Sequence, residues 1–179
     1  MTFALSVNTF SSPWTTMDQT VEVWQMCTST TPSGQYCQFR TCQGPECALH
    51  LYQNNGLCIK ASGIPGAGLG LFAAQTFRKG DAIGEYTGEE LSLDALTERY
   101  GSALAAYTLC DGTRYIDARN SNSCAVRFAN DARGTDKRNN ATFVPSTFIL
   151  EATKTIGNGS EIFVNYGDEY WDAFQTDIF

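Results

Sequence analysis

The sequence predicts a mostly β domain made of short strands with little helix. Its 179 residues fit one ordinary domain, with or without a small appendage. Hydrophobic residues make up 42% of the chain and charged residues 17%, and these shares are typical of globular proteins. From Leu57 onward, short apolar runs alternate with turns rich in Gly, Pro and Asp, a pattern typical of strands.

The individual strands are predicted from these apolar runs and from the turn signals between them. A glycine-rich turn at 63–68 and a second turn at 78–81 separate the first three strands. Asp111-Gly112, between the runs 107–110 and 113–116, indicates a hairpin with a two-residue turn. The other expected strands are 57–60, 69–74, 82–87, 143–150 and 161–165.

Two short helices are also expected. Ser92 is placed to cap a helix in which Leu93, Leu96 and Tyr100 share one face. Residues 168–174 suit a short helix anchored by aromatic side chains. The chain shows no internal repeat, so we expect one β-rich domain and not a solenoid.

The cysteines divide the chain into segments. Residues 1–20 are rich in Ser and Thr and are expected to form a mobile tail, whereas residues 59–179 are expected to form the main domain. Residues 21–58 hold five of the seven cysteines. Because zinc favours four Cys or His ligands in a tetrahedron, one interpretation is a zinc site; the other is a set of buried thiols. The candidate ligands are Cys37, Cys42, Cys47 and Cys58, with Cys27 or His50 as alternatives.

Composition excludes several classes of function. A net charge of −7 leaves no basic excess for general or sequence-specific nucleic-acid binding and favours a cationic partner. The single histidine, His50, excludes a His-rich metal centre. No apolar run approaches the ~20 residues of a spanning helix, and the N-terminus is a poor signal peptide. We therefore expect an intracellular protein with reduced thiols.

The glycine cluster Gly66-x-Gly68-x-Gly70 superficially resembles a dinucleotide-binding loop. That loop must be followed by a long helix in a βαβ unit, but here the segment before the turn at 78–81 is too short for such a helix. A Rossmann fold is therefore not expected. Two interpretations remain: a flexible turn between strands, or a loop whose backbone passes close to a ligand.

Four segments in order favour the second interpretation. Together, residues 68–73, 85–89, 115–130 and 161–167 resemble the SET-domain protein lysine methyltransferases, and the ending Tyr166–Trp171 is similar to that of compact members. The resemblance covers about residues 57–174 and implies small curved β-sheets with a C-terminal pseudoknot. In that fold 161–166 would be threaded, with 127–130 beside it.

The resemblance also implies a site that binds S-adenosylmethionine on one face and a substrate lysine on the other. Tyr166 matches the catalytic tyrosine, and Tyr86 and Tyr107 match positions along the lysine channel. For Arg127 a structural ion pair is an alternative to cofactor contact, and for Tyr86 and Tyr107 so is packing in the core. Asp117 is expected to hold a strand end. The implied cofactor-binding residues are Gly68, Leu69, Gly70, Arg127, Phe128, Asn130, Asp131, Tyr166 and Trp171, and Phe143, Val164 and Tyr170 are expected beside the channel.

The chemistry of methyl transfer to an amine suits such residues. The nucleophile must be a neutral amine, and a dry channel lowers the pKa of lysine by desolvation. Tyrosine rings accommodate an alkylammonium group, and a hydroxyl can orient it. We expect a basic protein substrate, a histone tail by family analogy, and a nuclear location with the cytoplasm as alternative. Acids that could steer such a peptide are Glu161, Asp168, Glu169, Asp172 and Asp177.

The chain departs from the family pattern in two places. Asp131 stands where many members have His, and no cysteine follows Cys124, so a zinc site after the SET domain is not expected. The segment around Tyr170-Trp171 would then close the channel. Because Val164 and Phe143 carry no hydroxyl to retain a water molecule, we expect di- or trimethylation.

Two rival functions belong to other classes. A catalytically inactive SET-like module would bind peptides without transferring a methyl group. A secreted, disulfide-bonded domain is suggested by seven cysteines and by the sequons at Asn140 and Asn158. The odd cysteine count argues against the second rival.

Overall fold

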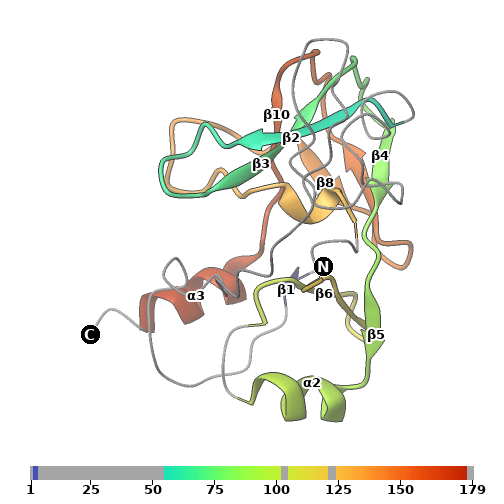
Figure 1. Cartoon of the computed structure of the whole chain (residues 1–179), viewed down its shortest axis with the longest axis vertical. Coiled ribbons are helices and arrows are strands. Elements are labelled where there is room, and N and C mark those ends of the chain that lie inside the picture. Colours follow the sequence, from blue (N-terminus) through green and yellow to red (C-terminus); the bar gives the residue numbers. More distant parts are fainter. Residues whose placement is uncertain (1, 4–54, 102–104, 121–123, 177–179) are drawn as a thin grey trace, which may run out of the picture.

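The computed structural model describes residues 2–3, 55–101, 105–120 and 124–176 (Figure 1). Within these ranges the chain forms three small antiparallel sheets, two short α-helices and a 3₁₀ turn. The prediction of a mostly β domain with few helices is confirmed. Two sheets lie in the upper half of Figure 1, and the third lies below them with the helices.

The first sheet holds the glycine-rich turn. Strands β2 (Leu57–Ala61) and β3 (Leu69–Ala73) pair across that turn, and β10 (Glu161–Ile162) pairs with the other edge of β3. The backbone N–H of Ser62 donates to the carbonyl of Gly68 at 2.9 Å and closes the turn. The sheet therefore joins the glycine motif directly to the C-terminal part of the chain.

The second sheet corrects one predicted strand. The expected strand 143–150 is instead a hairpin of β8 (Ala141–Phe143) and β9 (Ile149–Ala152), and β9 also pairs with β4 (Ala82–Glu85). Pro145, at the turn, has no N–H to donate to a ladder, and Ser146 and Phe148 have positive φ values of 72° and 56°. A continuous strand is therefore excluded, and the hydrophobic run folds back on itself.

The third sheet has the order β1-β6-β7-β5. Its hairpin pairs Cys110 with Tyr115, so the two turn residues are Gly112-Thr113 and not Asp111-Gly112. The Asp111 carboxylate accepts hydrogen bonds from the backbone of Thr113 and Arg114, which stabilises the shifted turn. Its strands are β1 (Thr2–Phe3), β5 (Glu89–Leu91), β6 (Thr108–Cys110) and β7 (Tyr115–Asp117).

Helix α2 (Leu93–Tyr100) begins as expected, because the Ser92 hydroxyl accepts a hydrogen bond from the N–H of Ala95 at 3.1 Å. Its packing differs from expectation: Leu96 is buried, but Leu93 is 57% exposed. The second cluster in which Leu96 packs is small, with Leu91 and Ala105 as its other buried members. This cluster contacts a narrow strip of the helix surface, and Leu93 lies outside that strip.

The remaining segments are described in part. Helix α3 (Asp168–Thr176) confirms the expected C-terminal helix, and a 3₁₀ turn, η2, spans Val126–Phe128. Thr2 and Phe3 of the expected tail pair with β6, whereas 4–20 lies outside the described residues. None of the described helices is long and apolar enough to cross a membrane.

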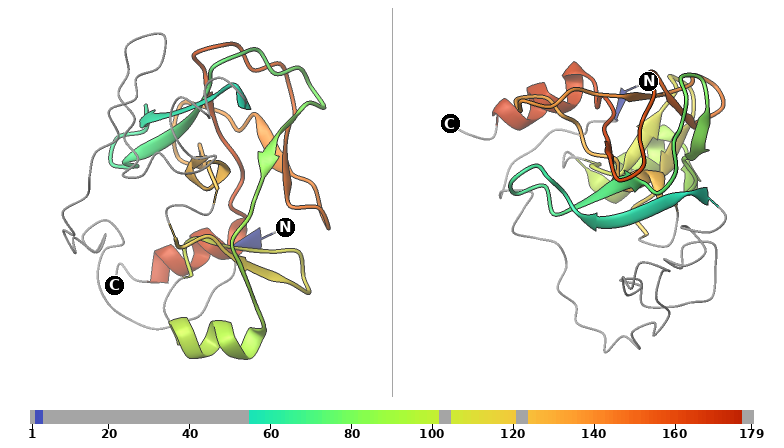
Figure 2. Two further views of the ribbon diagram at one scale, coloured as in Figure 1. Left: turned by 45° about the vertical axis from the view of Figure 1, so that its right-hand side comes forward. Right: turned by 90° about the horizontal axis from the view of Figure 1, so that it is seen from above.

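The C-terminal segment 161–164 lies between two distant parts of the chain. On one side, the N–H of Val164 donates to the carbonyl of Asn130 at 2.9 Å. On the other, the Asn140 side chain donates to the carbonyl of Glu161 and accepts from the N–H of Phe163, both at 2.8 Å. Residues 130 and 140 are the two ends of one loop, so the segment is threaded beside that loop as the pseudoknot requires. Figure 2 shows the chain descending from there to α3.

Asn140 is buried and its amide is fully used in holding the threaded segment. We expect Asn140→Asp to lower the free energy of unfolding by about 2 to 4 kcal/mol, because the carbonyl of Glu161 loses its donor and a charge is buried. Urea denaturation measures the change, with exposed Asn158→Asp as control. Equal stability of the two variants would contradict the prediction. The same burial removes the sequon at Asn140 as a sign of glycosylation.

Candidate functional site

The glycine turn, Asn130 and the threaded segment meet at one place. The Asn130 side chain donates to the carbonyl of Leu69 at 2.9 Å, and its Nδ2 lies 3.5 Å from the Glu161 carboxylate. Gly68 has a φ of +70°, which favours glycine, and a Cβ there would meet nothing within 4 Å. The turn therefore presents an open stretch of backbone beside Asn130.

Gly70 is required for a different reason, which is space. A Cβ at Gly70 would overlap the Glu161 carboxylate and lie 3.3 Å from Nδ2 of Asn130. Gly70, Glu161 and Asn130 thus form one packed unit, and any side chain at position 70 would push it apart.

Glu161 has a role that the sequence analysis missed. Its carboxylate is 9% exposed and accepts hydrogen bonds from the Ser62 hydroxyl at 2.6 Å and the Gly63 N–H at 2.8 Å. It therefore anchors the glycine turn and does not belong to the expected peptide-steering acids. Of those acids, Asp168, Glu169 and Asp172 are exposed, and Asp177 lies outside the described residues. The strand pairing of Glu161 with Phe72 places it there, and no local sequence signal does.

Tyr166 stands at the exit of the threaded segment. Its hydroxyl donates to the carbonyl of Ala129 at 3.0 Å. Its ring stacks on Trp171, with centroids 6.3 Å apart and planes 16° from parallel, and meets Tyr170 edge-on at 4.7 Å. Tyr170 is buried, so the three rings form a single aromatic group at the start of α3.

Asp131 lies beneath this aromatic group. One carboxylate oxygen accepts hydrogen bonds from the Tyr166 N–H and the Trp171 indole, each at 2.9 Å. The other accepts from the Arg133 N–H and the Asn139 amide. The carboxylate is thus turned inward to the protein.

Tyr86 and Phe143 form a second aromatic group, and Tyr107 adjoins it through its backbone. The Tyr86 hydroxyl donates to the carbonyl of Tyr107 at 2.7 Å, and its ring meets Phe143 edge-on at 5.4 Å. Both Tyr86 and Phe143 are buried, as is Val164. These positions therefore also serve the core, as the packing alternative supposed.

Arg127 lies over the Tyr107 ring at 4.0 Å and over Phe128 at 4.9 Å. Its Nε is buried and has no hydrogen-bond partner. Among the described residues no acid forms an ion pair with Arg127. Contact with aromatic rings therefore places this guanidinium, and the ion pair that was one of its expected roles is absent from the described part.

The tyrosine hydroxyls hold their protons firmly. Burial raises the pKa of Tyr86 and of Tyr166 well above the ordinary value, and burial also raises that of Tyr170. At neutral pH Tyr86, Tyr166 and Tyr170 are therefore neutral phenols.

These raised pKa values predict a loss of stability in alkali. Unfolded tyrosines ionise near pH 10, whereas folded Tyr86 and Tyr166 stay protonated to higher pH. Above about pH 10 the unfolded chain binds fewer protons, so the free energy of unfolding falls as pH rises, by up to ~1.4 kcal/mol per pH unit for each tyrosine. Urea denaturation between pH 8 and 11.5 measures this slope. Tyr86→Phe should make it shallower; an unchanged slope would contradict the assignment.

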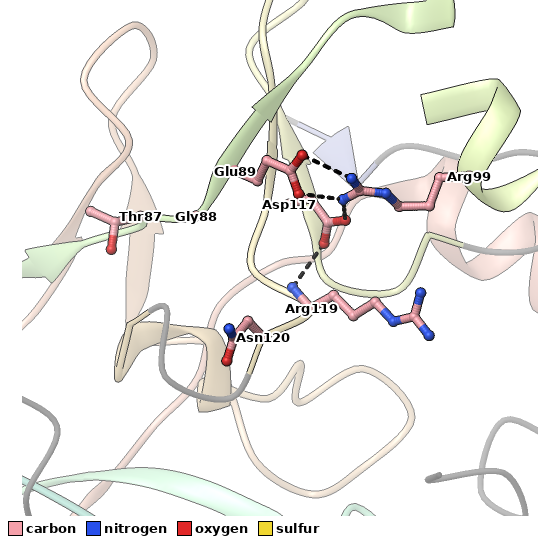
Figure 3. A pocket seen from close by; sticks show the side chains of 7 residues that line it. All are labelled: Thr87, Gly88, Glu89, Arg99, Asp117, Arg119 and Asn120. Carbon is pink, nitrogen blue, oxygen red and sulfur yellow. Dashed lines mark hydrogen bonds and ion pairs between the residues drawn. The ribbon is translucent and has the colours of Figure 1, made fainter. Parts of the chain in front are cut away.

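A separate cavity of about 670 Å³ lies beside β5 and β7 (Figure 3). Asp117 at its wall is 3% exposed and accepts hydrogen bonds from Arg99 and from the Tyr100 hydroxyl, both at 2.7 Å. Burial, together with that bond, raises the pKa of Tyr100 to about 12. Asp117 also accepts from the N–H of Arg119 and so holds the end of β7, as predicted. The lining residues are Thr87, Gly88, Glu89, Arg99, Asp117, Arg119 and Asn120.

The predicted zinc ligands fall almost entirely outside the described residues. Cys37, Cys42 and Cys47, with the alternatives Cys27 and His50, lie in the segment 4–54. Cys58 is half-buried in β2, and burial raises the pKa of its thiol. Cys110 and Cys124 are buried.

Comparison with known proteins decides the family. The sequence pattern of the SET domain matches residues 68–167, more than half of the chain. The chain belongs to the SET-domain family. The match begins at the first glycine of the site and ends just after Tyr166, so it contains both aromatic groups except for Tyr170 and Trp171. No curated protein matches the chain.

Solved structures with a similar fold include those of polycomb repressive complex 2. The complex of Chaetomium thermophilum matches 75% of this SET-domain chain at 26% identity and a TM-score of 0.54. The structure of ctPRC2 with H3K27me3 and H3K27M matches 75% at 26% and 0.52. The autoinhibited ctPRC2 bound to S-adenosylmethionine matches 80% at 24% and 0.52, which supports the fold alone. The aligned region covers 17%, 16% and 18% of those chains respectively.

Proposed function

We propose that this SET-domain protein transfers methyl groups from S-adenosylmethionine to the side-chain amine of lysine in a basic protein. The observation that carries the proposal is the meeting of the open glycine turn, Asn130 and the Tyr166 aromatic group on one threaded segment. Each part comes from a different region of the chain, and packing brings them together.

The residues around the glycine turn fit the cofactor. Gly68 leaves its backbone open, and Gly70 allows Glu161 and Asn130 to close behind the turn. Leu69 lies between these glycines, and Phe128 and Asn130 follow on the adjoining 3₁₀ turn. We propose that these residues, with Asp131, Arg127, Tyr166 and Trp171 at the edge, bind S-adenosylmethionine, which supplies an electrophilic methyl group.

The tyrosines would act by positioning, without ionising. The hydroxyl of Tyr166 donates to the carbonyl of Ala129, which fixes the direction of the phenol oxygen, and we propose that this oxygen orients the substrate amine. Tyr86 and Tyr107, with Phe143, Val164 and Tyr170, would enclose the lysine chain in an apolar environment that favours the neutral amine. Alignment of the amine with the methyl group then supplies much of the rate.

A histone tail is the proposed substrate and the nucleus the proposed location. A similar structure contains H3K27me3 and H3K27M, and the exposed acids Asp168, Glu169 and Asp172 on α3 suit a Lys/Arg-rich peptide. Radiolabelled transfer from S-adenosylmethionine to an array of histone peptides tests this. Labelling confined to lysine peptides supports the proposal; peptide binding without label would instead favour the inactive binding module.

Product multiplicity is a separate prediction. Phe143 lies against Tyr86 and Val164 is buried, so neither brings a hydroxyl that would retain a water molecule beside the amine. We expect di- or trimethyl-lysine as the product, and Phe143→Tyr should shift it towards monomethyl-lysine. Mass spectrometry of a peptide under excess enzyme measures both. A wild-type product that stops at monomethyl-lysine would contradict the prediction.

Zinc binding by Cys37, Cys42, Cys47 and Cys58 remains part of the proposal. Metal analysis of freshly purified full chain tests it, with Cys58→Ser as the variant whose position is described. Stoichiometric zinc that falls in the variant supports the site, and its absence from the wild type would exclude it.

A further inference from the structure

The Asp131 side chain connects Tyr166 and Trp171, the two stacked members of the aromatic group. It is 6% exposed and follows Asn130, while Tyr166 and Trp171 lie 35 and 40 positions further along the chain. One oxygen, Oδ2, accepts both the backbone N–H of Tyr166 and the indole N–H of Trp171 at 2.9 Å. This one oxygen therefore fixes the separation between the Tyr166 backbone and the Trp171 ring, which stacks on the Tyr166 ring.

The other oxygen fixes Asp131 itself. Oδ1 accepts the N–H of Arg133 at 2.9 Å and the amide of Asn139 at 3.0 Å, and Asn139 in turn accepts the N–H of Ala132. All four partners of the carboxylate are N–H donors, so each of its oxygens accepts two hydrogen bonds. The loop 131–139 thus clamps the carboxylate and aims Oδ2 at the aromatic group.

The surface ion pair nearby cannot replace this connection. Arg133 bonds to Asp168 at 2.7 Å at the start of α3, but the Asp168 side chain is 86% exposed and the pair is screened by water. Charge-assisted bonds to a buried carboxylate are the stronger of the two. Of these two polar connections between the loop and α3, the one through Asp131 is therefore the stronger.

We propose that Asp131 is the positioning residue of this site: its carboxylate sets Tyr166 and Trp171 in one arrangement, and through them it controls the rate of methyl transfer. The expected effect on the rate rests on the proposed function, whereas the expected effect on the positions of Tyr166 and Trp171 does not. This role belongs to the Asp131 side chain, and it leaves the backbone of Asp131 to the proposed contact with the cofactor. Asn cannot substitute, because either orientation of its amide turns an NH₂ group towards two N–H donors.

The test compares Asp131→Asn with Asp136→Asn in the ¹⁵N-labelled full chain. Asp136 lies in the same loop with its side chain 93% exposed, which makes it a matched control. Trp171 is one of three tryptophans, so Trp171→Phe identifies its indole signal. We expect Asp131→Asn to shift both the Trp171 indole and the Tyr166 amide resonances, and Asp136→Asn to shift neither. Unmoved resonances in Asp131→Asn would overturn the inference.

Kinetics separate positioning from mere stability. We expect Asp131→Asn to lower kcat at least tenfold while the KM for the peptide stays within threefold of wild type, because Asp131 is buried whereas the acids proposed to attract the peptide are exposed on α3. Wild-type kcat together with shifted resonances would overturn the inference. A wild type that transfers no methyl group would refute the proposed function, and the spectra alone would then judge the positioning.

A second variant covers failure of Asp131→Asn to fold. Trp171→Phe removes one donor to Oδ2 and keeps a stacked ring. We expect it to shift the Tyr166 amide resonance and to lower kcat severalfold. An unmoved Tyr166 resonance together with wild-type kcat in this variant would also overturn the inference.

Discussion

Tyr166→Phe is expected to reduce methyl transfer about a hundredfold while the protein stays folded. The change removes the hydroxyl that bonds to Ala129 and that we propose to orient the amine, and displacement of a reacting group by ~1 Å can cost this factor. The ring and its stack on Trp171 remain. Radiolabel transfer to a histone peptide measures the loss, and circular dichroism with thermal unfolding checks the fold.

Tyr115→Phe is the matched control for this change. Tyr115 lies in β7 and packs against the separate cluster of Leu91 and Leu96. It loses the same hydroxyl but should keep activity within about twofold, as for a substitution away from the site. If Tyr166→Phe retained more than about a tenth of wild-type activity, the hydroxyl would not have the proposed role.

Gly70→Ala is expected to weaken cofactor binding and to destabilise the domain by about 1 to 3 kcal/mol. The new methyl group would overlap the Glu161 carboxylate, which anchors Ser62 and Gly63 of the glycine turn. Displacing Glu161 therefore moves the turn against Asn130. Calorimetric titration with S-adenosylmethionine should show an affinity lower by at least about tenfold, which corresponds to ~1.4 kcal/mol.

Gly157→Ala makes the same chemical change where there is room. A Cβ at Gly157 would meet only the Ser160 hydroxyl at 3.8 Å, an ordinary contact. Both the affinity for S-adenosylmethionine and the urea midpoint should stay near those of wild type. Equal behaviour of the two variants would show that space at position 70 does not shape the cofactor site.

The local elements followed from local signals, and the errors have local physical causes. Ser92 capped α2 as predicted, because the bond to Ala95 involves residues three apart. The strand predicted at 143–150 was wrong because an apolar run was given more weight than Pro145, which breaks it. The hairpin turn shifted by one residue because the Asp111 carboxylate caps its own turn, an interaction that hydrophobic patterning does not report.

The candidate site likewise has features that the sequence predicts and partners that it does not. Residue types and their order indicated the family, the glycine turn and Tyr166 without any structure, because backbone freedom at glycine and the chemistry of a phenol are properties of single residues. The partners of those residues could not be predicted. Glu161 was assigned to the surface from its charge, yet strand pairing with Phe72 buries it behind the glycine turn.

The sequence by itself determined which groups are available: an acidic β domain with a glycine turn, several tyrosines and the aspartate Asp131. Only the tertiary structure decided how they work together. It threaded 161–164 between Asn130 and Asn140, and it placed Trp171 and Tyr166 on one oxygen of Asp131. Hydrogen bonds between residues 20 to 40 positions apart leave no periodic pattern in a sequence, so only folding reveals them.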